Sequence, residues 1–152
     1  MNEFTITSSS ISGDSNQRAD FSGIRYTSGF RDGKTDIGLS LEYGQSDVLL
    51  NETNTLALKG AYWLLGPTLR WQLNSGSNPY YFLMNFLAGT TEHDEIGIIA
   101  LANLGFRFSF QESYQLGINW GAMNIDLNEN EGIISESNQY HYLYGINFGY
   151  HF

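Results

Sequence analysis

The stretch Tyr140-His-Tyr-Leu-Tyr-Gly-Ile-Asn-Phe-Gly-Tyr-His-Phe152 decides the fold class of this chain. Every even-numbered residue in it is aromatic or aliphatic, whereas the odd-numbered residues are mostly small or polar. A period of two is that of a β-strand with one apolar face, and a tilted strand of ~9 to 11 residues crosses a membrane. In a transmembrane barrel this pattern turns the rings towards lipid and the small polar residues into a narrow lumen. We therefore expect a transmembrane strand.

Composition supports a barrel and excludes several other classes. The 152 residues predict one domain, residues 1–152, and 17 glycines against two prolines suit tightly connected strands. No run of about 18 apolar residues can form a transmembrane helix. Cysteine is absent, which excludes disulfides and thiolate metal sites. A net charge of -9 with only seven lysines and arginines argues against nucleic-acid binding. No signal peptide is recognisable at Met1, so we expect a mature form whose export signal has been removed.

Turn signals predict the number of strands. Asp32-Gly33, Gln111-Glu-Ser113 and residues 74–79 are short connections. Longer polar segments lie near residues 12–19, 45–53, 90–96 and 126–137. Short and long connections alternate strictly if residues 54–73 form one strand. The prediction is an all-β, eight-stranded, antiparallel up-and-down barrel with both chain ends on the short-turn side.

The strand at residues 54–73 has an ambiguous pattern. Its apolar residues change from even to odd numbers, from Leu56, Leu58, Tyr62 and Leu64 to Leu69, Trp71 and Leu73. One extra residue would explain the change, and a bulge is expected at Gly66-Pro67. The strand at residues 80–89 has apolar residues at both even and odd numbers, so the sequence does not assign its inward and outward faces.

Aromatic residues gather near both ends of the predicted strands. Outward positions between these ends include Ile24, Leu39, Leu41, Leu104 and Ile118. Amphipathic rings prefer the headgroup level of a membrane, so two aromatic belts around an aliphatic band indicate an outer-membrane barrel. The expected girdle residues are Phe30, Trp71, Tyr80, Phe110 and Tyr114 near the short turns, and Tyr43, Trp120, Tyr140 and Tyr142 near the long loops.

Three segments resemble the OmpX/Ail family of small outer-membrane barrels. They are Leu65-Gly-Pro-Thr-Leu-Arg70, Gly105-Phe-Arg-Phe-Ser-Phe110 and the terminal Tyr144-Gly-Ile-Asn-Phe-Gly-Tyr-His-Phe152. The resemblance implies a role in surface adhesion, host-factor binding or envelope integrity. It also implies that Phe148, Tyr150 and Phe152 form the signal that the barrel-assembly machinery reads.

Alternation also predicts an ion network in the lumen. Arg25, Glu42, Lys59, Arg70 and Arg107 should point inward. A charge without a partner is costly in a narrow lumen, so Glu42 is expected between the cations Arg25 and Lys59. Such a network would plug the barrel, since an eight-stranded interior is just wide enough for side chains to fill. The alternative, a proton or ion pathway, stays open.

Most acidic residues fall in the long connections and predict a negative outer end. Solubility explains such residues, and bridging to lipopolysaccharide through divalent cations or attraction of a basic partner are alternatives. Glu92, Asp94 and Glu95 are weak candidates for metal ligands because they lack the spacing of an EF-hand loop. No metal or other cofactor is expected. Apolar Val48-Leu-Leu50 and Ile133-Ile134 are candidates for adhesive patches.

Two other functional classes remain to be tested. A lipid A-modifying enzyme would need a serine, a histidine and a carboxylate, and His141 lies near Ser135, Glu136 and Ser137. However, the lipid A deacylases carry a His-x-Ser motif, which is absent here, and His141 should face the lumen. A soluble calycin-type lipid carrier would reverse the faces, with aromatic residues lining a cavity. We expect a monomeric, non-enzymatic outer-membrane barrel whose partners are membrane lipid, lipopolysaccharide, the barrel-assembly machinery and an extracellular protein ligand.

Overall fold

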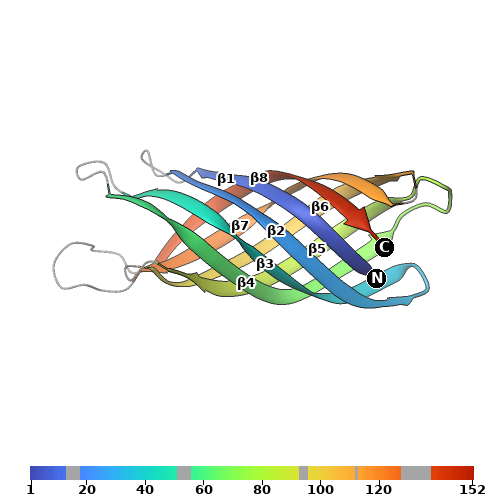
Figure 1. The fold of residues 1–152 in the computed structure, drawn as a ribbon, viewed down its shortest axis with the longest axis horizontal. Coiled ribbons are helices and arrows are strands. Elements are labelled where there is room, and N and C mark those ends of the chain that lie inside the picture. Colours follow the sequence, from blue (N-terminus) through green and yellow to red (C-terminus); the bar gives the residue numbers. More distant parts are fainter. Residues whose placement is uncertain (13–17, 51–55, 93–95, 112, 128–137) are drawn as a thin grey trace.

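The computed structural model describes residues 1–12, 18–50, 56–92, 96–111, 113–127 and 138–152. Within this part of the chain, eight strands form one closed barrel (Figure 1). No described helix is both long and apolar enough to span a membrane. The strands are β1 (Asn2–Ser12), β2 (Arg18–Asp32), β3 (Thr35–Leu50), β4 (Leu56–Gln72), β5 (Tyr80–Thr91), β6 (Ile96–Phe110), β7 (Tyr114–Leu127) and β8 (Asn138–His151).

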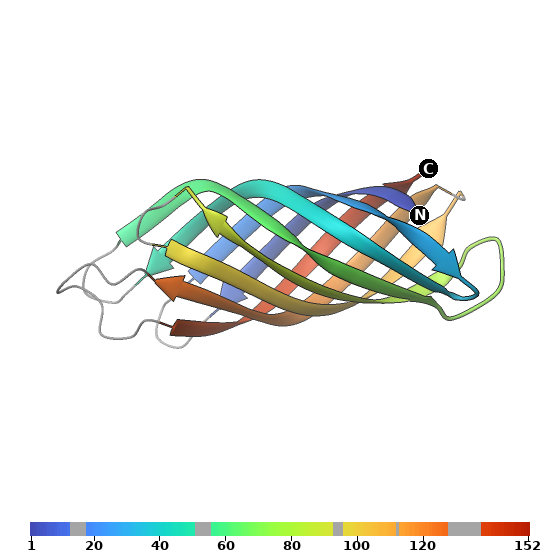
Figure 2. The ribbon, with the colours of Figure 1, turned by 90° about the horizontal axis from the view of Figure 1, so that it is seen from below.

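Each strand pairs antiparallel with its neighbours in sequence, and β1 closes the barrel against β8. Closure removes both sheet edges, so none of the described strands is an edge strand with a row of unpaired backbone groups. Both termini lie at the end that carries the short connections (Figures 1 and 2). Gly33 at φ 62° and Gln111 at φ 50° form two of these turns. The predicted up-and-down barrel, its strand number and the position of its ends are confirmed.

Side chains alternate between the two faces as the terminal strand predicts. In β8 the rings of Tyr142, Tyr144, Phe148 and Tyr150 are exposed on the outer face. The apolar residues predicted to face outward on β2, β3, β6 and β7 do so as well. The interior holds polar side chains at the short-turn end, which is the reverse of a lipid carrier with an aromatic cavity.

The predicted bulge in β4 is wrong. The register of β4 against β3 runs without a shift from Trp71 to Leu56. Tyr62 and Leu64, predicted to face lipid, are 0% and 1% exposed in the lumen, and Trp63 and Leu65 take the outer face.

Gly66 has a different structural role from the one predicted. A Cβ at this position would collide with the carbonyl oxygen of Phe86 on β5. The glycine therefore permits close approach of two backbones.

The structure also settles the faces of β5 and the lengths of the strands. Tyr81, Leu83, Asn85 and Leu87 point inward, so that the outer face carries the even-numbered residues. The predicted connection at residues 45–53 is too wide, because β3 continues to Leu50.

Candidate functional site

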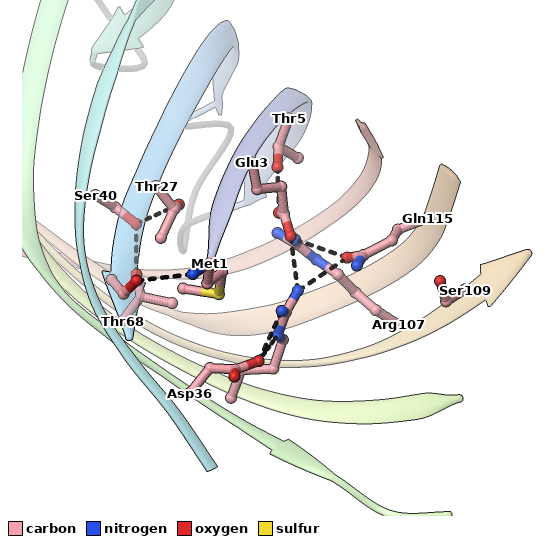
Figure 3. Close-up of polar contacts among 12 residues, drawn as sticks. Met1, Glu3, Thr5, Thr27, Asp36, Ser40, Thr68, Arg107, Ser109 and Gln115 are labelled. Carbon is pink, nitrogen blue, oxygen red and sulfur yellow. Dashed lines mark hydrogen bonds and ion pairs between the residues drawn. The ribbon is translucent and has the colours of Figure 1, made fainter. Parts of the chain in front are cut away.

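In the lumen at the short-turn end, five side chains of alternating charge form a continuous series of ion pairs, which we call the ion chain. In order they are Arg31, Asp36, Arg70, Glu3 and Arg107. Arg70 bridges the two carboxylates, with Nη2 2.7 Å from Asp36 Oδ2 and Nη1 2.8 Å from Glu3 Oε2. Figure 3 shows Glu3, Asp36 and Arg107 converging inside the barrel. Arg70 and Arg107, predicted to face inward, thus lie in one network with two carboxylates that the sequence analysis did not select.

Glu3 has more hydrogen-bonding partner residues than any other member of this series of ion pairs. Its carboxylate accepts hydrogen bonds from Thr5, Arg70 and Arg107. Gln115 completes the set when its amide nitrogen donates to Glu3 Oε2 at 3.0 Å and its oxygen accepts from Arg70 Nη1 at 3.1 Å. Since a carboxylate offers about four lone-pair sites, four donors satisfy it fully despite its burial.

A second ion pair lies further towards the loops. Arg25 donates from Nε to Glu42 Oε2 at 2.7 Å. The other oxygen, Oε1, accepts from Thr7 at 2.8 Å and from the Tyr62 hydroxyl at 2.7 Å. Both charged groups are almost fully buried. The hydrogen bonds from Thr7 and Tyr62 stabilise the Glu42 carboxylate in place of the second cation that the sequence predicted.

The predicted inward position of Lys59 is wrong. Its side chain is 74% exposed on the outer face, where Nζ lies 2.9 Å from Asp47 Oδ2. The error follows from the bulge that was assumed in β4, which shifted every residue before Gly66 to the opposite face. Tyr62 takes the position beside Glu42 that the prediction gave to Lys59.

A line of hydroxyl and amide groups crosses the lumen from β2 to β6. Its members are Thr27, Ser40, Thr68, Asn85 and Asn103. Thr68 donates to Asn85 Oδ1, so the Thr68 oxygen must accept from Ser40, and Ser40 in turn accepts from Thr27. Every hydroxyl in the line therefore points its proton the same way, and neighbouring strands are fixed to each other through the interior.

The loop end of the lumen is filled by apolar side chains. Among the described residues a buried cluster joins six strands: Ala19, Phe21, Tyr62, Leu64, Leu87, Ile99, Leu101, Met123, Ile125 and Leu143. All are at most 5% exposed. The lumen is thus polar towards the short turns and contains a buried apolar cluster towards the loops.

The outer face carries the predicted aromatic residues. Phe30, Tyr43, Tyr80, Tyr114, Trp120 and Tyr142 are exposed, and Trp71 and Phe110 are half-buried. Several rings contact one another across strands, including Tyr43 with Trp63 and Tyr114 with Tyr150. The side chain of Tyr140 lies outside the described residues. Phe148, Tyr150 and Phe152 lie exposed in a row at the end of the chain.

The loop candidates are mostly outside the described part of the chain. This holds for Asp94, Glu95, residues 133–137 and the side chains of Val48, Leu49, Leu50 and His141. Glu92 is described and exposed. The described residues contain no group of three potential metal ligands.

Comparison with known proteins agrees with the barrel fold. The outer membrane enzyme PagL superposes with a TM-score of 0.60 at 9% identity, over 97% of this chain and 99% of PagL. The de novo designed protein TMB2.3 matches with a TM-score of 0.46 at 10% identity, over 99% of this chain and 94% of TMB2.3. The outer membrane protein OprG from Pseudomonas aeruginosa gives 0.42 at 16% identity over 98% and 95%.

At these identities the likeness shows the fold alone. No family model matches the chain, and no curated protein matches it either. The OmpX/Ail assignment therefore stays a prediction.

Proposed function

We propose that this chain is a non-enzymatic, non-conducting barrel of a Gram-negative outer membrane that acts through its loop-side end. The observation that carries the proposal is the buried apolar cluster at the loop end of the lumen, to which six of the eight strands contribute. An ion that entered this cluster would lose its water and find few polar partners, at a cost of several kcal/mol or more. Because ions do not pass through such a lumen, the surfaces available for binding are the two ends of the barrel and its outer wall.

The specific role that we propose is the one implied by the sequence resemblance to the OmpX/Ail family. Surface adhesion, host-factor binding or envelope integrity would be mediated by the loops, with an extracellular protein or lipopolysaccharide as partner. The exposed row Phe148, Tyr150 and Phe152 supports recognition by the barrel-assembly machinery, because lipid-facing rings at the chain end are accessible before the barrel closes.

Conductance across planar bilayers tests the central part of this proposal. The refolded protein should give no conductance steps above background. A Met123→Ser/Leu143→Ser variant, which places two hydroxyl groups in the apolar cluster, should leak ions. Stable channels in the unaltered protein would contradict the proposal.

Lipid A analysis tests the non-enzymatic part. Cells that express the chain with an export signal should show unchanged acylation of lipid A by mass spectrometry. PagL, an outer membrane enzyme, shares this fold, so the non-enzymatic part of the proposal needs a direct test. A change in acylation that His141→Ala abolishes would replace the proposal with an enzymatic function.

A further inference from the structure

The alternating ion chain at the short-turn end carries a positive charge that no carboxylate in it neutralises. It contains three guanidinium groups, Arg31, Arg70 and Arg107, and two carboxylates, Glu3 and Asp36. Each carboxylate is shared between two arginines, so the chain begins and ends on a cation. The exposed Asp32 and Lys34 in the adjacent turn offset each other. The described residues of this lumen end therefore favour an additional anion.

A cavity of about 310 Å³ lies at the Arg31 end of this ion chain. Its walls include Arg31, Arg70 and several side chains that can donate hydrogen bonds. Exposed residues of the connection between β4 and β5, Gly76 and Ser77, form part of its rim. The polar side chains in its lining include Arg31, Arg70, Ser77, Tyr81, Ser109 and His151. The volume lies at the lower end of the range for small-molecule sites.

The two arginines in the cavity wall are already held in place. Arg31 makes a two-pronged contact with Asp36, from Nε at 2.7 Å and from Nη2 at 3.2 Å. This contact directs Nη1 away from Asp36, and 48% of the Arg31 side chain is exposed. Arg70 stacks over the Tyr81 ring, with Cζ 4.5 Å from its centroid. A ligand would therefore meet guanidinium groups whose side-chain entropy is already lost.

We propose that this cavity binds a small oxyanion, either a phosphate or a carboxylate, that enters from the short-turn side. Nη1 of Arg31 supplies the principal charged hydrogen bond, and the hydroxyl of Ser77 on the exposed rim supplies a neutral donor. Guanidinium groups suit phosphate and carboxylate oxygens because their planar donors match the geometry of both. A bound monoanion would bring the alternating ion chain, with three arginines and two carboxylates, to neutrality.

NMR titration of the folded protein in detergent micelles tests this proposal. Sodium phosphate and sodium acetate are added separately at constant ionic strength, with chloride as the balancing ion. Saturable shifts are expected for the Arg31 and Arg70 Nε–H signals and for the Ser77 amide, but not for Arg25 in the second ion pair. The anion that saturates at the lower concentration identifies the phosphate or the carboxylate class.

Three variants separate a specific site from general attraction. Arg31→Gln should weaken binding by about tenfold or more, because a charged hydrogen bond is lost. Lys34→Gln removes an equal charge from the neighbouring exposed turn and should change affinity by less than about twofold. Ser77→Asp, on the exposed rim, should abolish binding by placing a carboxylate at the cavity. Shifts that never saturate, or equal losses in Arg31→Gln and Lys34→Gln, would overturn the proposal.

Discussion

Replacing Glu42 with glutamine should destabilise the barrel far more than replacing Asp47 with asparagine. Glu42 and Arg25 are 4% and 5% exposed, so Glu42→Gln leaves a buried guanidinium without its counter-charge. Breaking a buried pair from one side costs about 3–5 kcal/mol. Asp47 pairs with Lys59 on the outer face, where both side chains are at least 49% exposed, and such pairs contribute about 0–1 kcal/mol. We expect the free energies of unfolding of the two variants to differ by at least about 2 kcal/mol.

Urea unfolding in lipid vesicles, followed by tryptophan fluorescence and gel mobility, measures these free energies. Lys59→Gln should behave like Asp47→Asn, since Lys59 does not reach the lumen. A double variant, Arg25→Met/Glu42→Leu, should recover much of the stability lost in Glu42→Gln, because it removes both charges. Equal costs for Glu42→Gln and Asp47→Asn, or a large cost for Lys59→Gln, would refute the assignment of the lumen ion pairs.

Three further changes test other parts of the structure. Tyr62→Phe removes one donor to Glu42 without changing the shape of the core, and it should cost about 1–3 kcal/mol in the same unfolding assay. Gly66→Ala places a methyl group against the Phe86 carbonyl and should sharply reduce refolding yield, whereas Gly76→Ala makes only an ordinary van der Waals contact with Asn74 and should leave it unchanged. Equal yields would remove the close-approach explanation. Phe152→Ala should slow insertion in cells while leaving the unfolding free energy of refolded protein nearly unaltered, and pulse-chase assembly kinetics check this.

The fold could be predicted from sequence because one rule, the alternation of outward apolar and inward polar residues, governs most of the strands. Alternation over β8, together with the turns at Asp32-Gly33 and Gln111-Glu-Ser113, gives strand direction, number and outer face. Lipid contact requires apolar residues on the whole outer wall, so the period-two pattern is strong wherever the lumen is polar.

The prediction fails where the lumen is itself apolar. Tyr62, Leu64 and Leu87 face the interior, and their strands therefore show apolar residues at both parities. Composition cannot distinguish an apolar lumen layer from a lipid-facing surface, and the bulge assigned to Gly66-Pro67 followed from that ambiguity. Lys59 was misplaced with it.

The ion chain was predicted only in part because its members come from distant strands. Arg70 and Arg107 could be selected by parity alone, but Glu3 contacts them only once β1 closes against β8. Asp36 lies next to a turn, where an acidic residue is common for other reasons. The alternation of outward and inward residues along β1 and β3 places both Glu3 and Asp36 in the lumen. This alternation is the sequence signal that could have identified the two carboxylates.

Quenching of tryptophan fluorescence by brominated lipids tests the central claim, that the outer wall of the barrel contacts acyl chains. Trp63, Trp71 and Trp120 make up all three tryptophans, and each points outward near an aromatic belt. The protein refolded into vesicles should show strong quenching, greater with bromines near the headgroup than with bromines near the chain end. A folded, monodisperse protein in detergent-free buffer, whose tryptophans escape quenching when vesicles are added, would contradict the account.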